Sequence, residues 1–188
     1  MRRLFIACKI DLSSTTRALQ QQLHYELQLN DMVWVKEDVT HMTLRFLGKT
    51  PEYVLEDLKS TLKEISESHE AFEMSLDKIG VFGSRYKPEV LWLGFHEFSK
   101  FQAIFEQLEP ALIRLGFEHY RGNFVPHITL ARIKGVLDKK KFWQAIQSYQ
   151  VETPQRIAIR ELILYQSFLH ADGPEYKVLA TFPLRQPE

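Results

Sequence analysis

Apolar and polar residues alternate in several short segments of the chain, which is the pattern of half-buried β-strands. These segments are 3–10, 32–36, 41–47, 72–82, 89–95, 126–133, 156–168 and 175–184. In four other segments the apolar residues recur three or four positions apart, which predicts helices. The first helix begins near residue 14, and the fourth covers 138–149. The second carries an apolar stripe over 55–65, and the third carries one over 101–115.

Proline and glycine indicate where two of these helices begin and end. Pro51 occupies the place of a first helical residue, with Thr50 before it as the predicted N-cap. Gly116 is expected just beyond the end of the helix over 101–115. Pro110 falls inside the stripe of that helix, and because proline lacks a backbone N–H, we expect a kink or a break there.

The order of these elements predicts an α+β fold with a mainly antiparallel sheet, because strands and helices do not alternate regularly. No segment is rich enough in Gly, Pro or Ser to be a linker, and 188 residues are enough to bury one core. We therefore expect residues 1–188 to form a single domain of two lobes. Similar short segments around residues 41 and 127 suggest that the chain has two related halves.

The charge balance limits the kind of partner that the protein binds. Lys plus Arg and Asp plus Glu number 24 each, so no overall positive field is available to hold a long nucleic-acid duplex. A polyanionic partner must then be bound locally. The one cysteine, Cys8, lies in an apolar run and is expected to be buried. No run is long enough for a membrane span or a signal peptide, so we expect a cytoplasmic protein.

Two strand-like segments carry the same motif, a histidine and a threonine two residues apart with apolar neighbours. They are His41-Met42-Thr43-Leu44 and His127-Ile128-Thr129-Leu130. Two such motifs arise by chance in well under about one comparable chain in a hundred. Because side chains alternate along a strand, each histidine shares a face with its threonine. If the two strands are neighbours, both pairs converge on one cavity.

Two imidazoles on opposite sides of a reacting atom form an acid–base pair for an in-line displacement. One removes a proton from the attacking water, and the other protonates the leaving oxygen. Thr43 and Thr129 are placed to donate hydrogen bonds to phosphoryl oxygens. Arg132 offers a fork of donors that matches a phosphate. In a regular strand Arg132 lies on the opposite face from His127, so it reaches the cavity only if the strand ends or bulges there.

The doubled motif resembles the paired His-x-Thr-hydrophobic motifs of the two-histidine phosphoesterase superfamily. Within it, the chain is most similar to the RNA 2′,3′-cyclic phosphodiesterases, once described as 2′-5′ RNA ligases. The likeness extends over nearly the whole chain, through segments that read "LFIA", "HMTLRFLG", "VLWLG", "PHITLAR", "LILYQSFL" and "GPEYKVLATFPL".

The resemblance implies a bilobed fold in which two mainly antiparallel sheets, related by a pseudo-two-fold axis, flank a central groove, with helices outside. It also implies metal-independent, cofactor-free hydrolysis of RNA or nucleotide 2′,3′-cyclic phosphate to a 2′-phosphate. By the resemblance, His41 and His127 are catalytic, and Thr43, Thr129 and Arg132 bind the phosphate. The family favours His127 as base and His41 as acid. We expect a monomer that acts on RNA 3′ ends or short nucleotides, without a membrane partner.

Other interpretations of these residues remain open at this point. The histidines can instead be core residues that hydrogen-bond their own threonines, on a non-catalytic nucleotide-binding module. The same acid and base can also catalyse 2′-5′ ligation, the reverse reaction. Trp34, Arg45 and Phe46 are possible RNA contacts or ordinary core and surface residues. The remaining histidines occur in polar, surface-like settings; they are His24, His69, His96, His119 and His170.

Two further motif readings are rejected. The "LGKT" at 47–50 lacks the preceding glycine of a phosphate-binding loop, because Thr43 stands at that position. No His-Glu-x-x-His motif or cysteine pair indicates zinc.

Overall fold

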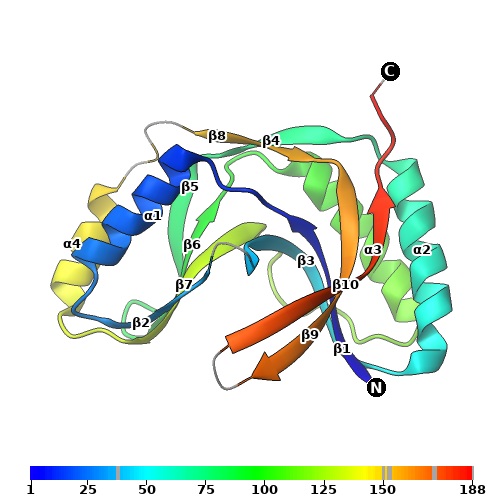
Figure 1. The fold of residues 1–188 in the computed structure, drawn as a ribbon, viewed down its shortest axis with the longest axis horizontal. Helices are drawn as coiled ribbons and strands as arrows, with labels where there is room; N and C mark the ends of the chain where they lie inside the picture. The colour runs from blue at the N-terminus through cyan, green and yellow to red at the C-terminus, as the bar shows by residue number, and fades with distance from the viewer. Residues whose placement is uncertain (37–38, 150, 152–153, 171–172, 188) are drawn as a thin grey trace.

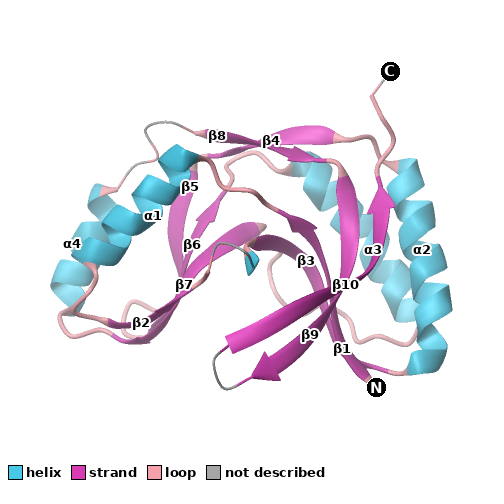
Figure 2. Cartoon of the chain, viewed as in Figure 1, coloured by secondary structure: helices cyan, strands magenta, loops and turns pink. Residues whose placement is uncertain are grey.

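The structure is a computed structural model that describes residues 1–36, 39–149, 151, 154–170 and 173–187. It is an α+β fold, as predicted (Figures 1 and 2). The strands are β1 (Arg2–Lys9), β2 (Asp31–Trp34), β3 (His41–Thr50), β4 (Phe72–Leu76), β5 (Lys78–Gly83), β6 (Pro88–Gly94), β7 (His127–Gly135), β8 (Gln155–Ile159), β9 (Glu161–His170) and β10 (Gly173–Pro183). The helices are α1 (Ser14–Glu26), α2 (Leu55–Ser68), α3 (Ser99–Arg114) and α4 (Lys139–Ser148), with a 3-10 turn, η2 (Glu52–Val54), before α2.

The large antiparallel sheet consists of two four-stranded halves. Its order is β10-β9-β1-β3-β7-β6-β5, and β2 pairs with the outer part of β7. The halves meet where β3 lies beside β7, and the described residues show one backbone pair there, Met42 opposite Ile128. Both side chains are fully buried. The sheet therefore bends around a single point of contact, which leaves a groove between its two halves.

Helices cover the outside of both halves, as expected. In Figure 1, α2 and α3 stand beside the half that contains β1, β3, β9 and β10, and α1 and α4 stand beside the other half. Each of these helices turns an apolar stripe inward; in α2 the stripe is Leu55, Leu58, Leu62 and Ile65. The main core lies between these helices and the sheet. Cys8 belongs to it and is buried, as predicted.

Two segments predicted as single strands are each divided between two sheets. The chain of 72–82 forms β4 and then β5, and the chain of 156–168 forms β8 and then β9. Because β4 pairs with β8 in a separate two-stranded sheet, each segment must change partners, at Asp77 and at Arg160 respectively. This small sheet joins the two lobes on the side away from the joint of β3 and β7 (Figure 1).

One predicted helix boundary is wrong, and a break that was considered inside another helix does not occur. Thr50 is not an N-cap: it is the last residue of β3, fully buried, and its hydroxyl donates to the carbonyl of Gly48. Pro51 precedes the 3-10 turn, and α2 starts only at Leu55. Pro110 does not break α3, which continues to Arg114. The proline lies on the exposed side of the helix, so the carbonyl that loses its N–H partner faces water.

Candidate active site

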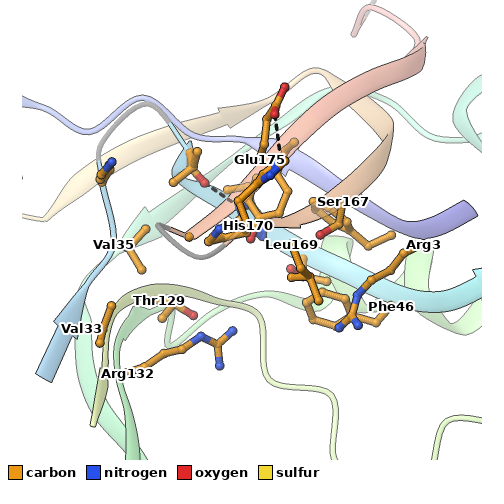
Figure 3. A pocket seen from close by; sticks show the side chains of 18 of the residues that line it. Arg3, Val33, Val35, Phe46, Thr129, Arg132, Ser167, Leu169, His170 and Glu175 are labelled. Carbon is orange, nitrogen blue, oxygen red and sulfur yellow. Dashed lines mark hydrogen bonds and ion pairs between the residues drawn. The ribbon is translucent and has the colours of Figure 1, made fainter. Parts of the chain in front are cut away.

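All five residues predicted for the site line one cleft between the two halves of the sheet. The cleft has a volume of about 1140 Å³ and is lined by His41, Thr43, His127, Thr129 and Arg132, among others. Figure 3 shows Thr129 and Arg132 on one wall, and Arg3 and Phe46 on the opposite side. The sequence motifs are therefore brought together from strands β3 and β7, as the alternation pattern predicted.

The backbone pair between β3 and β7 explains this convergence. Because Met42 lies opposite Ile128 in an antiparallel register, the residues on either side of each point to the other face of the sheet. That face is the floor of the cleft. An antiparallel pair has a local two-fold axis, so His41 and His127 approach the cleft in equivalent positions.

A β-bulge follows each motif at the same place. In β3, Ile6 pairs with Arg45 and Ala7 with Thr43, so Leu44 is left without an opposite residue. In β7, Leu91 pairs with Ala131 and Trp92 with Thr129, so Leu130 is likewise unopposed. An extra residue reverses the facing of every residue after it.

The bulge at Leu130 decides the position of Arg132. Leu130 and Ala131 are both buried, and Arg132, next along, is exposed on the cleft side. Arg132 therefore shares a face with His127, which a regular strand would not allow. The equivalent residue after the bulge in β3 is Phe46, which also lines the cleft and is 58% exposed. The two halves thus present a cation and an aromatic ring at matching positions.

In each histidine, one ring nitrogen contacts the backbone carbonyl of the residue two positions earlier in the chain. His41 Nδ1 lies 2.7 Å from the carbonyl of Val39, and His127 Nδ1 lies 2.8 Å from the carbonyl of Val125. A carbonyl only accepts, so Nδ1 carries the hydrogen in both rings. Nε2 is then the atom that accepts a proton from, or donates one to, a molecule in the cleft. The hydrogen bonds do not go to the threonines, in contrast to the core-histidine interpretation.

Aromatic rings surround both imidazoles. His41 packs on Phe5 at 5.0 Å between ring centroids and meets the edge of Tyr176 at 5.1 Å. His127 meets the edge of Phe82 at 4.7 Å and lies 6.1 Å from Trp92. These contacts pack apolar rings beside each imidazole and so contribute to its burial.

Burial lowers the pKa of both histidines below the ordinary value of 6.5. The hydrogen bond to the carbonyl acts in the opposite direction in each case but does not offset the burial. The positive charge of Arg132 lowers both pKa values further, and a protonated His127 also lowers the pKa of His41. Each imidazole is thus sensitive to the other charges of the cleft, as expected for a functional pair.

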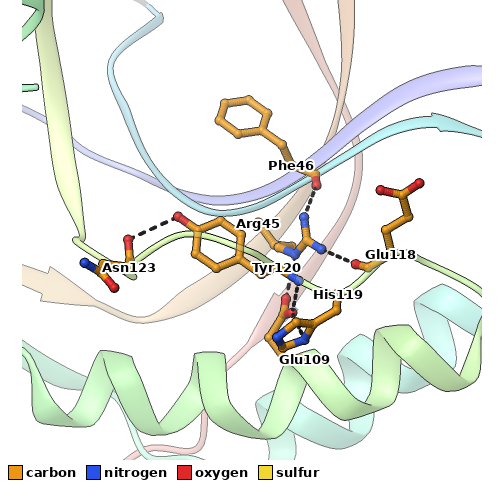
Figure 4. Close-up of polar contacts among 7 residues, drawn as sticks. All are labelled: Arg45, Phe46, Glu109, Glu118, His119, Tyr120 and Asn123. Atoms are coloured by element: carbon orange, nitrogen blue, oxygen red, sulfur yellow. Dashed lines mark hydrogen bonds and ion pairs between the residues drawn. The ribbon is translucent and has the colours of Figure 1, made fainter. Parts of the chain in front are cut away.

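Arg45 does not reach the cleft. Its Nε donates to Glu109 Oε1 at 2.5 Å, and its Nη2 donates to the carbonyl of Glu118 at 2.6 Å (Figure 4). Glu109 also accepts from the backbone N–H of Tyr120 at 2.9 Å. This nearly buried ion pair ties β3 to α3 and to the segment that leads into His127. Arg45 is therefore a structural residue.

The structure also places the remaining residues that the sequence left open. Trp34 lines the cleft and stacks on the exposed His24 at 4.8 Å. His170 is exposed, as predicted, yet it also lines the cleft and pairs with Glu175 at 3.1 Å. Sequence reasoning missed Arg3, Phe5 and Tyr176 as cleft residues, because alternation shows which residues share a face but not which face is open.

Comparison with known proteins places the chain in a family. A family model described as "LigT like Phosphoesterase" matches residues 10–92 and 97–176. The chain belongs to this family. Both His-x-Thr motifs of this LigT-like phosphoesterase lie inside the matched residues.

Two curated relatives of this LigT-like phosphoesterase carry the same name. A protein of Thermotoga maritima named RNA 2′,3′-cyclic phosphodiesterase is 30% identical over 94% of this chain and 92% of its own length. A protein of Methanocaldococcus jannaschii with the same name is 29% identical, over 94% of this chain and 98% of its own. Among solved structures, a Thermus thermophilus protein matches with a TM-score of 0.81 at 26% identity, covering 99% of this chain and 100% of that one.

The fold is also that of a structure with a bound nucleotide. Escherichia coli LigT, solved in complex with 3′-AMP, matches with a TM-score of 0.75 at 22% identity, over 98% of this chain and 99% of that one. Within the described parts of our chain, no three or more His, Cys, Asp or Glu side chains form a group that could hold a metal ion. No helix of these parts is long and apolar enough to span a membrane.

The charge of Arg132 generates a prediction for the free protein. We expect both imidazole pKa values, measured by NMR titration of the ring protons, to lie below 6.5. Arg132→Gln should raise both, because it removes a positive charge that disfavours the imidazolium forms. Arg156→Gln, on the distant β8, is the matched control and should change neither. A pKa of His41 that stays the same in Arg132→Gln would contradict this assignment.

The Arg45–Glu109 pair generates a second prediction. Arg45→Met should lower the free energy of unfolding by about 3–5 kcal/mol, because the nearly buried Glu109 carboxylate then keeps only the Tyr120 N–H and the exposed His119, 3.8 Å away, as partners. The double variant Arg45→Met with Glu109→Met should recover part of that loss. Urea unfolding of the two single variants and the double variant measures both quantities. A double variant no more stable than Arg45→Met would refute the argument from an uncompensated charge.

Proposed function

We propose that this protein hydrolyses the 2′,3′-cyclic phosphate of RNA 3′ ends or short nucleotides to a 2′-phosphate. The observation that carries the proposal is the pair of equivalent histidines that line one cleft, each with Nδ1 bound to a carbonyl and with Nε2 in no hydrogen bond to any residue that the structure describes. The curated relatives named RNA 2′,3′-cyclic phosphodiesterase support it. We further propose that the enzyme acts as a single two-lobed domain, as a monomer, in the cytoplasm.

In the proposed mechanism, His127 is the base and His41 is the acid. Neutral His127 accepts a proton at Nε2 from a water molecule, whose oxygen attacks the phosphorus. The bond from phosphorus to the 3′-oxygen breaks in line with this attack, and protonated His41 donates its Nε2 proton to that oxygen. The products are a 2′-phosphate and a free 3′-hydroxyl. The two histidines then exchange one proton to return to their starting states.

The hydroxyls and the guanidinium stabilise the phosphoryl group during this reaction. Thr43 and Thr129 donate to the non-bridging oxygens from the two sides of the joint. Arg132 adds a charge-assisted pair of hydrogen bonds; within the described residues its side chain has no ion pair or hydrogen bond that competes for it. Because these groups carry the proton transfers and the charge, the scheme needs no metal ion.

Phe46 is proposed to bind the terminal nucleoside. Its ring lies in the cleft next to Phe5, at 5.6 Å, and Phe5 in turn lies under His41. An exposed ring beside the reacting phosphate offers a base a stacking surface that tolerates any sequence. This geometry suits a single-stranded end, whose last base is unstacked, better than a duplex.

Removal of either histidine tests the reaction. His41→Ala and His127→Ala should each lower kcat by roughly 10²- to 10⁴-fold, because each removes one proton transfer. Phosphorus NMR of chelator-treated protein with adenosine 2′,3′-cyclic phosphate, and with an RNA carrying a cyclic end, would report the 2′-phosphate directly. His69→Ala, outside the cleft, is the control. A 3′-phosphate product would overturn the proposed bond cleavage, and binding without turnover would make the protein a nucleotide reader.

The dependence of the rate on pH is a separate test. The base must be neutral and the acid protonated, so kcat/KM should be bell-shaped and centred below pH 6.5, because both histidine pKa values are lowered. The bound phosphate anion favours the imidazolium, so the alkaline limb of kcat should lie at higher pH than that of kcat/KM. Initial rates at constant ionic strength measure both profiles. A maximum of kcat/KM on the alkaline side of pH 8 would contradict the assignment.

A further inference from the structure

A row of hydrogen-bond donors crosses the cleft face of the sheet beyond Phe46. Arg3 of β1 lies directly opposite Lys49 of β3. On the other side of β1, Leu4 pairs with Gln166 of β9. The next residue of β9, Ser167, therefore lies beside Arg3. Ser167 in turn pairs with Tyr176 of β10. Arg3, Ser167 and Tyr176 line the cleft. Figure 3 shows Arg3 and Ser167 near Phe46, on the side of the cleft away from Arg132.

Arg3 and Lys49 form a pair of like charges without a compensating partner. Residues directly opposite in an antiparallel pair share a face, and like charges there are destabilising. Over the described ranges, neither side chain makes an ion pair or a side-chain hydrogen bond, whereas the adjacent Arg2 pairs with Glu52 at 2.7 Å. The two cations therefore gain most from an anion bound between them.

This row is continuous with the proposed catalytic centre. Arg3 and Phe5 are two residues apart on the same face of β1, which places them about 7 Å apart along the strand. Phe5 contacts both His41 and Phe46. Outward from His41, the surface thus presents aromatic rings and then two cations. An RNA end has the matching order: the terminal cyclic phosphate is followed by the last nucleoside and then by the phosphate on the 5′ side of that nucleoside.

The other half of the cleft does not repeat this row. Val90 pairs with Arg132 in β6, as Phe5 pairs with Phe46 in β1. Two residues before Val90 is Pro88, at the position that corresponds to Arg3. Although the backbones of the halves correspond, the other half has no cation at the position of Arg3. Among the residues that the structure describes, its cleft-lining cation besides Arg132 is Lys36, so Lys36 is the alternative contact to be tested for a polyanionic chain.

We propose that Arg3, Lys49 and Ser167 form a subsite for the phosphodiester that precedes the terminal nucleotide of the RNA. The inference rests on the proposed function and narrows its substrate class. The enzyme then prefers RNA ends to cyclic mononucleosides, because only the former carry a phosphate on the 5′-oxygen of the last nucleoside. The subsite lies away from the reacting atoms, so it acts mainly on KM.

Three substrates separate the contribution of that phosphate to kcat/KM from the contributions of the terminal nucleoside and the cyclic phosphate. They are adenosine 2′,3′-cyclic phosphate, the same molecule with a 5′-phosphate, and the dinucleotide ApA with a terminal 2′,3′-cyclic phosphate. Arg3→Gln should lower kcat/KM by roughly tenfold or more for the second and third, since a charge-assisted hydrogen bond is lost. For the first substrate, kcat/KM of Arg3→Gln should stay within about twofold of the value for the unaltered protein, because this substrate lacks the phosphate that Arg3 binds.

Two variants with the same kind of substitution act as controls. Arg2→Gln removes a cation one residue away, on the opposite face of β1, and should affect no substrate. Lys36→Gln removes a cation that lines the cleft on the opposite wall, beyond β2. The dependence of kcat/KM on salt should also be steeper for the dinucleotide than for the mononucleoside, and Arg3→Gln should remove most of that difference.

The possible results are distinct. An equal loss for all three substrates in Arg3→Gln would overturn the subsite, because Arg3 would then act on the fold or on the reaction itself. A loss of kcat/KM for the second and third substrates that occurred only in Lys36→Gln would overturn the subsite and would place the RNA strand over the opposite wall of the cleft. If the unaltered protein hydrolysed none of the substrates, the proposed function would fail. Calorimetry with ApA 2′-phosphate and adenosine 2′-phosphate would still test the subsite, through an affinity difference that Arg3→Gln abolishes.

Discussion

The pairing of Met42 with Ile128 is the contact on which the cleft depends. Along the described part of β3 and β7 it is the one backbone pair that joins the two halves of the sheet. Longer pairing would extend a continuous surface, and no pairing would leave two separate sheets. A single antiparallel pair instead leaves room on either side of the joint. Because such a pair has a two-fold axis, it also sets two copies of one motif against each other.

The polar groups of the cleft show how a protein without net charge can hold an anion. Lys plus Arg equals Asp plus Glu, yet the cleft is lined, within the described residues, by Arg3, Lys36 and Arg132 and by one carboxylate, Glu175, which contacts His170. Some of the other basic residues are paired with carboxylates; Arg45, for example, is turned toward Glu109 on the far side of the sheet. Cationic side chains thus outnumber carboxylates among the described residues that line the cleft. Selectivity then depends on the shape of that surface more than on long-range attraction.

Much of the fold and the centre of the site could be predicted from sequence, because both rest on local alternation. His41 and Thr43 share a face in any strand, so the predicted convergence needed only the two strands to be neighbours. The side on which Arg132 lies could not be predicted, since the bulge at Leu130 is visible only against the register of β6. The same limit applies to the long strand predicted over 156–168, which divides at Arg160 because its two parts pair in different sheets.

The two bulges have a consequence for how such a cleft can change during evolution. The second residue after each bulge turns out of the core: Leu44 and Leu130 stay buried, whereas Phe46 and Arg132 line the cleft. One half has a ring at this position and the other a guanidinium, on matching backbones. A position of this kind can exchange one chemistry for another without moving the histidine five residues earlier. A scaffold with two such halves can therefore change its nucleoside contact at the position of Phe46 while the residues proposed for the reaction, Arg132 among them, stay the same.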